Sequence, residues 1–195
     1  MLGLSSGDRA TEYPAFGADY DNRDARYREA QAIIRTVTEN DFPVATSDHY
    51  GSLSGNIDLI PKPAAGRIPT IVVGRARQDL SWIAGNTDGW IWHLSNFNRL
   101  PQLLEEWRAN WPDDVFRPYG YGSFFDLAEN AEQPLRYVGN SFSIGRKALL
   151  ELWKTQEAQG VSHVALNLKP LRRPATDAMQ ELAEYILPHF PAHGE

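Results

Sequence analysis

The sequence predicts an α/β fold with a parallel sheet, and three observations support this prediction. Short apolar runs alternate with longer segments of helical periodicity five times along the 195 residues. The run 69–74 is apolar and β-branched without alternation, as in a strand covered on both faces. No internal repeat or change of composition divides the chain, so we expect a single domain over residues 1–195. Strict alternation of strands and helices favours parallel strands joined by crossover helices.

The first strand–helix pair comes before a long irregular segment. Residues 1–5 form a short apolar run, and Asp21 or Asn22 can cap the helix that follows. The apolar positions of that helix are spaced by three and four, which indicates one buried face: Tyr27, Ala30, Ile33, Ile34 and Val37. Residues 41–68, rich in proline and glycine, are predicted to be a long inserted loop, which in compact domains is usually a lid or a binding segment.

The other four pairs follow in order. A short helix ending near Gly85 follows the strand at 69–74, and residues 89–93 form the next strand. Ser95 or Asn96 caps a helix with Pro101 in its first turn, where proline is tolerated. Two further pairs are predicted, a strand at 117–127 with a helix from Ser143 to Gly160, and a strand at 162–168 with a helix at 174–187.

Composition and charge narrow the function classes. Acidic residues outnumber basic ones by 25 to 19, which gives a net charge of −6 and argues against a nucleic-acid partner. The chain has no cysteine, which excludes disulfides, thiolate metal sites and cysteine nucleophiles. No apolar run approaches the roughly 20 residues of a membrane helix, and the N-terminus lacks the features of a signal peptide. We therefore expect a cytoplasmic protein with no membrane partner.

Two architectures accommodate five strand–helix units. A flavodoxin-type sheet has five strands and would be complete, whereas a TIM-type barrel has eight strands. Periodicity alone favours the flavodoxin-type sheet.

Several motifs favour the barrel instead. At 2–17 an apolar run ends in a small-residue turn and an acidic-aromatic run that closes on Phe16-Gly17, and the helix after it carries an early Arg26. Residues 68–84, 87–90, 145–149 and 160–168 continue the pattern in the right order and spacing. In sum the chain resembles the bacterial-luciferase-like flavin monooxygenases.

The resemblance implies an incomplete TIM-type (β/α) barrel. It covers strands four to eight and leaves the first three strands without a counterpart, so the domain reads as N-terminally truncated. We expect a fragment of a longer protein; the alternative is a natural truncation that closes by forming a homodimer through its open edges.

The loop 74–78 is the strongest candidate site. It lies between a strand and a helix start, where backbone N–H groups favour an anion, and arginine can grip phosphate with two hydrogen bonds. The resemblance implies that the loop holds the phosphate of FMN through Gly74, Arg75, Ala76, Arg77 and Gln78. The alternative is a solvated turn with two surface arginines. Relatives commonly place hydroxyl residues where this chain has Ala76 and Asp79, and a carboxylate there would either repel phosphate or cap the helix.

Other candidates lie at neighbouring strand ends. The resemblance places Ser5 and Ser6 against the flavin ring, unless they simply begin a turn. Arg26 is either a second phosphate partner or a surface ion pair with Glu29 or Asp24. His93 follows a strand and could face the substrate, although a lone histidine there is more often structural. Residues 145–147 open a helix and form a weaker anion site.

We predict a flavin-dependent oxidoreductase of the luciferase-like monooxygenase type. Reduced FMN, supplied by a flavin reductase, and oxygen would act on a small organic substrate whose identity the sequence does not predict. The alternatives are a deazaflavin-dependent hydride-transfer oxidoreductase and a non-catalytic flavin-binding or dimerising partial barrel. No hydrolase, P-loop or zinc-protease motif is present, and we assign no catalytic residue. We expect no metal, since His189 and His193 lack a third ligand.

Overall fold

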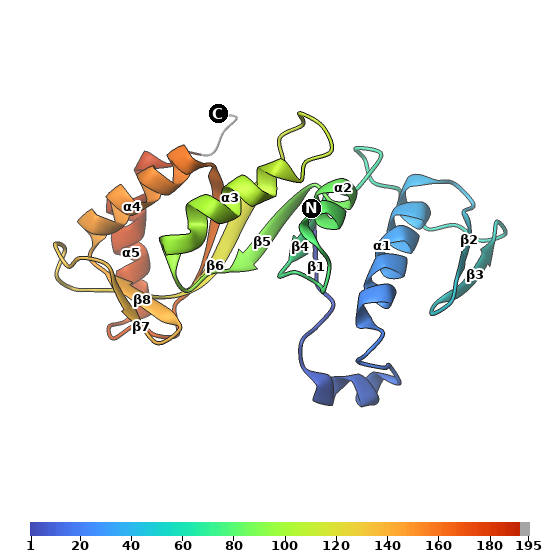
Figure 1. Cartoon of the computed structure of the whole chain (residues 1–195), viewed down its shortest axis with the longest axis horizontal. Coiled ribbons are helices and arrows are strands. Elements are labelled where there is room, and N and C mark those ends of the chain that lie inside the picture. Colours follow the sequence, from blue (N-terminus) through green and yellow to red (C-terminus); the bar gives the residue numbers. More distant parts are fainter. Residues whose placement is uncertain (192–195) are drawn as a thin grey trace. The chain divides into compact units, whose positions relative to one another are not determined.

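The structure is a computed structural model that describes residues 1–191. The chain divides into two compact units, of which the first comprises residues 1–90 and the second begins at residue 91. Strand β5 (Gly89–His93) spans the junction between the two units. Figure 1 shows the elements in chain order.

The first unit contains a pair of parallel strands. Strand β1 (Leu2–Leu4) pairs with β4 (Thr70–Val73), with Leu2 opposite Thr70 and Leu4 opposite Val72. Helix α1 (Arg23–Glu39) comes between the two strands in sequence, and α2 (Leu80–Asn86) follows β4. Because parallel strands end at the same edge of a sheet, the segments after Leu4 and after Val73 share one edge.

The apolar run of β4 forms the strand because its side chains are buried. Val72 is fully buried, and so are Ile83 and Ala84 on the inner face of α2. Near the start of the strand, the Asp88 carboxylate accepts hydrogen bonds from Thr70 N (2.8 Å) and from Arg67. The strand at 69–74 and the helix near Gly85 are thus found where the sequence predicts them.

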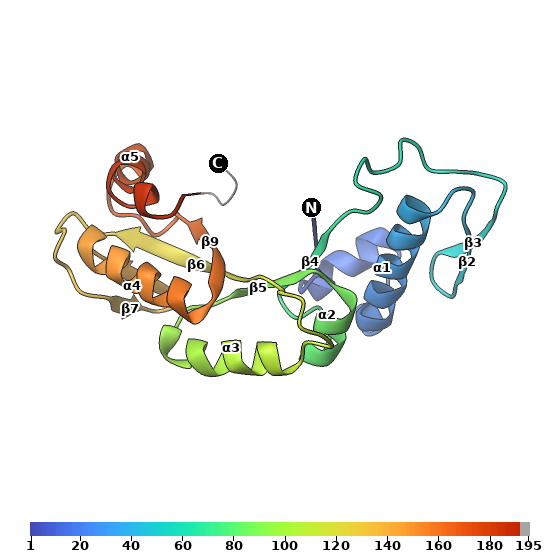
Figure 2. The same cartoon turned by 90° about the horizontal axis from the view of Figure 1, so that it is seen from above.

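The segment 41–68 contains more regular structure than a loop. Strands β2 (Val44–Ser47) and β3 (Gly51–Ser54) form an antiparallel hairpin. It lies on the side of α1 that faces away from β1 and β4 (Figure 2). Lys62 fastens the rest of the segment, because its Nζ donates to Val37 O (2.9 Å), Asn40 O and Asp58 Oδ1 (2.6 Å each). The end of α1 is therefore tied to this segment.

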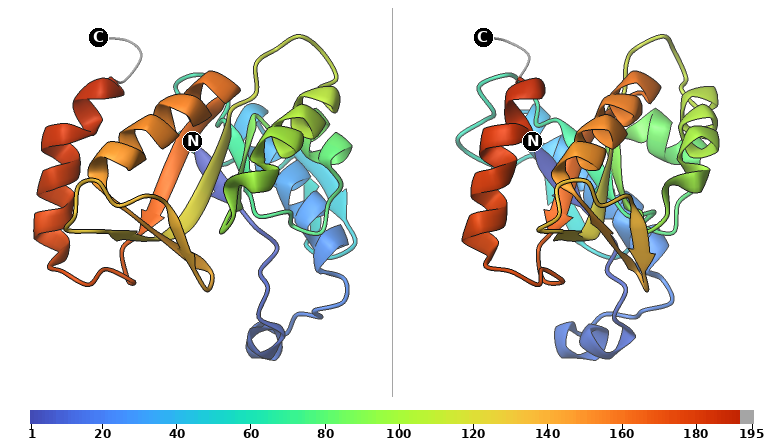
Figure 3. Two further views of the ribbon diagram at one scale, coloured as in Figure 1. Left: turned by 60° about the vertical axis from the view of Figure 1, so that its left-hand side comes forward. Right: turned by 90° about the vertical axis from the view of Figure 1, so that its left-hand side faces the viewer.

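Strand β6 organises the second unit. The second half of β6 (Tyr119–Leu127) pairs in parallel with β8 (Ser141–Ile144), and its first half pairs in parallel with β9 (Val161–Asn167). Strand β7 (Arg136–Val138) adds to β8 in the antiparallel direction. The α-helices described in this unit are α3 (Leu100–Ala109), α4 (Arg146–Gln159) and α5 (Ala175–Tyr185). Helices α4 and α5 lie next to each other (Figure 3). An ion pair between Arg146 and Glu181 joins them.

Aromatic side chains fill the core of the second unit. Tyr121 and Phe125 project from one face of β6 and are fully buried, as is Phe142 of β8. The buried Tyr121 hydroxyl donates to Oε1 of Gln156 on α4 at 2.7 Å. Trp107 of α3 donates from its indole to Arg117 O at 3.1 Å. The first hydrogen bond ties α4 to β6, and the second ties α3 to the segment just before β6.

Ser143 does not cap a helix. It lies in β8, where its hydroxyl donates to the buried Asp126 carboxylate at 2.8 Å, and Gly145 is the residue that precedes α4. A hairpin explains the difference, because Gly139 adopts φ +61° in the two-residue turn that joins β7 to β8. The segment η1 (Ala10–Phe16) is a 3-10 helix that the sequence did not lead us to expect.

The predicted α/β class and the mostly parallel pairing of the strands are confirmed. Over residues 1–191, no helix combines the length and the apolar character that crossing a bilayer requires.

Candidate functional site

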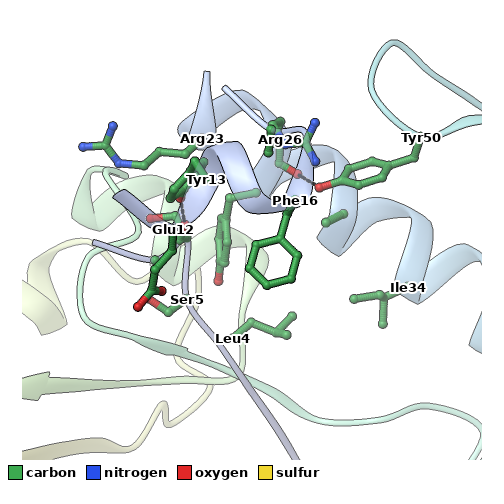
Figure 4. Close-up of a pocket in the computed structure, with 14 residues that line it drawn as sticks. Leu4, Ser5, Glu12, Tyr13, Phe16, Arg23, Arg26, Ile34 and Tyr50 are labelled. Carbon is green, nitrogen blue, oxygen red and sulfur yellow. Dashed lines mark hydrogen bonds between the residues drawn. The ribbon is translucent and has the colours of Figure 1, made fainter. Parts of the chain in front are cut away.

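A pocket of about 330 Å³ opens at the carboxyl end of β1, within the first unit. Its wall comes from the turn after β1, from η1, from one face of α1 and from the turn between β2 and β3 (Figure 4). Its volume lies at the low end of the roughly 300–1,000 Å³ that small-molecule sites occupy. Its lining includes hydroxyl, aromatic, apolar and arginine side chains: Ser5, Ser6, Tyr13, Phe16, Arg23, Arg26, Tyr27, Ile34 and Tyr50.

The turn after β1 is held by an aromatic residue. The hydroxyl of Tyr13 donates a hydrogen bond to Ser6 O, and its ring packs edge-on against Tyr20 with centroids 5.1 Å apart. Gly7 adopts φ +77°, and a Cβ there would lie 3.2 Å from the Tyr13 hydroxyl. The left-handed backbone therefore favours glycine here, and a Cβ would also crowd the Tyr13 hydroxyl. Ser5 and Ser6 are placed on the pocket wall by this turn.

One face of α1 forms the longest wall. Arg23, Arg26, Tyr27 and Ile34 follow the spacing of three and four that puts side chains on one helix face. The Arg23 guanidinium stacks 3.4 Å from the Tyr20 ring centroid and donates to Tyr20 O, so Arg23 is already engaged. Arg26 is half-buried, and none of the ion pairs among residues 1–191 includes it. The alternative expected for Arg26, an ion pair with Glu29 or Asp24, does not form in the structure, and Glu29 bonds Ser47 and His49 instead.

The loop 74–78 lies outside the lining of this pocket, at the carboxyl end of β4. Ala76 (φ +47°) and Arg77 (φ +57°) both adopt the left-handed conformation, which is costly for residues other than glycine and is common at functional sites. The indole of Trp90 donates to Gly74 O at 2.6 Å, and the Arg75 guanidinium lies 5.4 Å from the Trp90 ring centroid. Arg77 is exposed.

Gln78 fastens this loop to α1. Its side chain is buried, accepts from Arg28 Nε at 2.6 Å and donates to Ala76 O (3.0 Å) and Asp24 O (3.2 Å). All the polar atoms of the Gln78 amide are therefore engaged within the protein. Gln78 therefore ties the loop to α1 at Asp24 and Arg28, on either side of Arg26 in the sequence.

Asp79 caps α2. Its carboxylate accepts from Trp82 N at 2.7 Å and from Ser81 Oγ at 2.8 Å. The hydrogen bond from the Trp82 backbone, with that from Ser81, lowers the pKa of Asp79 below its ordinary value. Of the two roles expected for this carboxylate, the structure shows the helix cap.

His93 lies in a different pocket, of about 510 Å³, within the second unit. This pocket is also lined by Phe124 of β6 and Asn167 of β9, and the His93 and Phe124 rings meet edge-on at 5.6 Å. The weaker candidate at 145–147 is closed by main-chain carbonyls, since Gly145 N donates to Gln133 O and Lys147 N to Ala131 O.

Sequence reasoning missed three aromatic residues of the first pocket. Tyr13 and Phe16 belong to the acidic-aromatic run of the sequence and signal the pocket only once η1 is known. Tyr50 carries no signal of its own. In the part of the chain that the structure describes, no cluster of three or more metal-ligating side chains occurs. His193 lies outside the described residues.

Comparison with known proteins decides the family. The family model described as luciferase-like monooxygenase matches residues 1–180. The chain belongs to the luciferase-like monooxygenase family. The resemblance read from its motifs is thereby confirmed. The comparison with curated proteins found no match to this chain.

Two solved structures share the fold of this luciferase-like chain. One is an "F420-dependent secondary alcohol dehydrogenase in complex with an F420-acetone adduct", at 13% identity and a TM-score of 0.69, covering 95% of this chain and 68% of that one. The other is EDTA monooxygenase from Chelativorans sp. BNC1, at 12% identity and a TM-score of 0.57, covering 94% of this chain and 65% of that one. The chain thus spans about two thirds of the length of either structure.

Proposed function

We propose that this chain belongs to a flavin-dependent oxidoreductase of the monooxygenase type, which uses reduced FMN and oxygen on a small organic substrate. Family membership supports an oxidoreductase. Arg26 carries the proposal further, because it is a cation without an ion-pair partner among residues 1–191 and it lines a mostly apolar pocket. A planar ring with an anionic tail matches such a pocket.

The lining residues fit a flavin phosphate ester. Tyr27, Phe16 and Ile34 offer apolar surface to a ring, and Arg26 offers charge-assisted hydrogen bonds to a phosphate. Ser5 and Ser6, at the strand end, would supply hydroxyl groups to the ring edge. Arg75 and Arg77 would be further phosphate ligands. Gln78 holds their loop to α1.

The chain's own residues bind, orient and shield the cofactor. Bound reduced FMN would supply oxygen activation. Arg26 would fix the tail, while the aromatic wall would exclude water from one side of the ring. We also propose that a flavin reductase supplies the reduced flavin. The chain itself would form strands four to eight of an incomplete barrel.

Hydride transfer with a deazaflavin is the second candidate. It is favoured by the similarity to the F420-dependent alcohol dehydrogenase, which has the higher TM-score of the two structures. The same pocket serves this candidate, because a deazaflavin cofactor also joins a planar ring to a phosphate.

Titration of the purified chain with FMN, and separately with a deazaflavin cofactor, tests the proposal. Loss of a charge-assisted hydrogen bond costs about 1.5–3 kcal/mol, so Arg26→Ala should weaken binding by roughly 10- to 150-fold. Arg35→Ala is the control, since Arg35 lies on the same helix in an exposed pair with Glu39. The double variant R75A/R77A tests the loop, and unchanged affinity would remove it from the site.

Oxygen consumption driven by reduced FMN separates an enzyme from a flavin-binding module. Tight binding of FMN without turnover favours the non-catalytic partial barrel. Absence of saturable binding of either cofactor contradicts the proposed function altogether.

A further inference from the structure

One carboxylate on α1 holds the turn between β2 and β3. Oε1 of Glu29 lies 2.6 Å from Nδ1 of His49, and Oε2 accepts from His49 N at 3.1 Å and from the hydroxyl of Ser47. Ser47 Oγ in turn accepts from His49 N (3.2 Å) and Tyr50 N (3.0 Å). Both carboxylate oxygens are used, so Ser47 and His49 of the turn are bonded to the helix.

The hydrogen bonds to Glu29 favour its ionised form. The Ser47 hydrogen bond, opposed by burial and helped by the hydrogen bonds and charge of His49, lowers the pKa of Glu29 to about 2. The carboxylate therefore stays ionised, and accepts hydrogen bonds, at neutral pH.

Tyr50 is where this turn meets the pocket. It is the lining residue that the hairpin contributes, while all the others come from β1, η1, α1 and the turns between them. The Arg26 guanidinium lies 5.0 Å from the Tyr50 ring centroid, and the Tyr50 hydroxyl approaches Arg26 O at 3.5 Å. Figure 4 shows Tyr50 reaching toward Arg26 from the side opposite Ser5. Tyr50 is 47% exposed, so these contacts with Arg26 and the turn hold its ring, and burial in a core does not.

We propose that Tyr50 is a ligand-contacting residue that covers the outer end of the pocket, and that Glu29 is the positioning residue that holds it there. The inference rests on the proposed function and takes the same ligand class, a planar aromatic ring with an anionic group. The anion would lie against Arg26 and the ring against Tyr50. Glu29 acts one helical turn from Arg26, so a single segment of α1 places both contacts.

The rate constant for FMN dissociation is the quantity that this arrangement controls. A residue that covers a bound ligand slows its departure more than its arrival. Loss of one aromatic contact is expected to raise the dissociation rate constant about tenfold in Tyr50→Ala, with little change in the association rate constant. Tyr50→Phe keeps the ring, so FMN should dissociate from this variant at the wild-type rate.

Glu29 would not contact FMN. Glu29→Ala should nevertheless raise the rate constant for FMN dissociation toward that of Tyr50→Ala. Glu29→Gln keeps the shape and one acceptor oxygen, so an intermediate value is expected. Glu39→Ala is the control on the same helix, and Phe42→Ala is the control for an exposed aromatic residue of the 41–68 segment that does not line the pocket. Both should match the wild type.

Amide hydrogen exchange supplies a readout that does not depend on FMN. His49 and Tyr50 should exchange faster in Glu29→Ala than in Glu39→Ala, because both N–H groups are bonded within the turn that Glu29 holds. Unchanged exchange, or an FMN dissociation rate within twofold of wild type in Glu29→Ala and Tyr50→Ala, overturns the inference while the proposed function stands. A wild-type chain that binds neither FMN nor a deazaflavin overturns both.

Discussion

The hydrogen bond between Tyr121 and Gln156 allows a quantitative test of the core of the second unit. Both residues are buried, at 0% and 3% exposure, and Nε2 of Gln156 has no hydrogen-bond partner among residues 1–191. Tyr121→Phe removes the hydroxyl that donates to Gln156 Oε1 at 2.7 Å, which leaves the whole amide unsatisfied. A buried polar group without a partner costs about 1–3 kcal/mol.

For a chain of this size, each kcal/mol shifts the melting temperature by about 2–4 °C, so Tyr121→Phe should melt about 2–12 °C lower. Thermal unfolding followed by circular dichroism measures the shift. Tyr185→Phe is the control, because that hydroxyl belongs to an exposed side chain and its loss should have a small effect.

A double-mutant cycle sharpens the test. Gln156→Leu alone leaves the Tyr121 hydroxyl buried without its acceptor, and burial raises the pKa of Tyr121, so the group stays a protonated donor. The double variant Y121F/Q156L removes both partners and should recover most of the lost stability. A double variant as unstable as the sum of the single ones, or a Tyr121→Phe variant that melts like the wild type, refutes the reasoning.

Two further predictions concern backbone space and acid stability. Gly145→Ala should destabilise the second unit by about 1–3 kcal/mol, because its Cβ would lie 2.4 Å from Asn130 O and 2.5 Å from Ala131 O. Gly85→Ala, with open space inside α2, should instead stabilise by about 0.4–1 kcal/mol, and chemical denaturation compares the two. Burial raises the pKa of Asp88, but hydrogen bonds from Arg67 and Thr70 outweigh it and lower the pKa overall. The stability that Asp88 contributes is therefore present above its unfolded pKa and lost as the pH falls, so Asp88→Asn should lose less stability than wild type between about pH 5 and about pH 3; equal losses in melts at the two pH values would contradict this.

The sequence predicted elements well where burial dictates them. The β-branched run of β4 and the spacing of α1 are local patterns that the core requires, and both elements formed at the expected residues. Ser143 shows the limit, because its hydroxyl could cap a helix or bond a neighbouring strand, and only the position of Asp126 decides between the two. The Gly139-Asn140 pair that turns β7 into β8 was a readable hairpin signal that the strand–helix alternation obscured.

The candidate site divides in the same way. Ser5, Ser6 and Arg26 could be named from motifs, because they lie in continuous segments that resemble the family, and the structure places all three on one pocket. Tyr50 could not be named, since its place depends on the fold of a hairpin and on Glu29, which lies 21 positions earlier in the sequence. The distance between Arg26 and the loop at 74–78 likewise depends on Gln78, whose bonds to α1 join residues 50 and 54 positions apart.

The packing of Tyr27 gives the pocket an optical reporter. Tyr27 lines the pocket, and its ring meets Trp82 edge-on with centroids 5.9 Å apart. Trp82 also lies beneath the Arg28 guanidinium at 5.3 Å, on a helix that is capped at its first turn. Its emission therefore comes from a fixed environment one side chain away from the bound ligand. A ligand whose absorption overlaps tryptophan emission, as that of a flavin does, should quench Trp82, and a Trp82→Phe variant shows how much of the signal of the six tryptophans comes from this position.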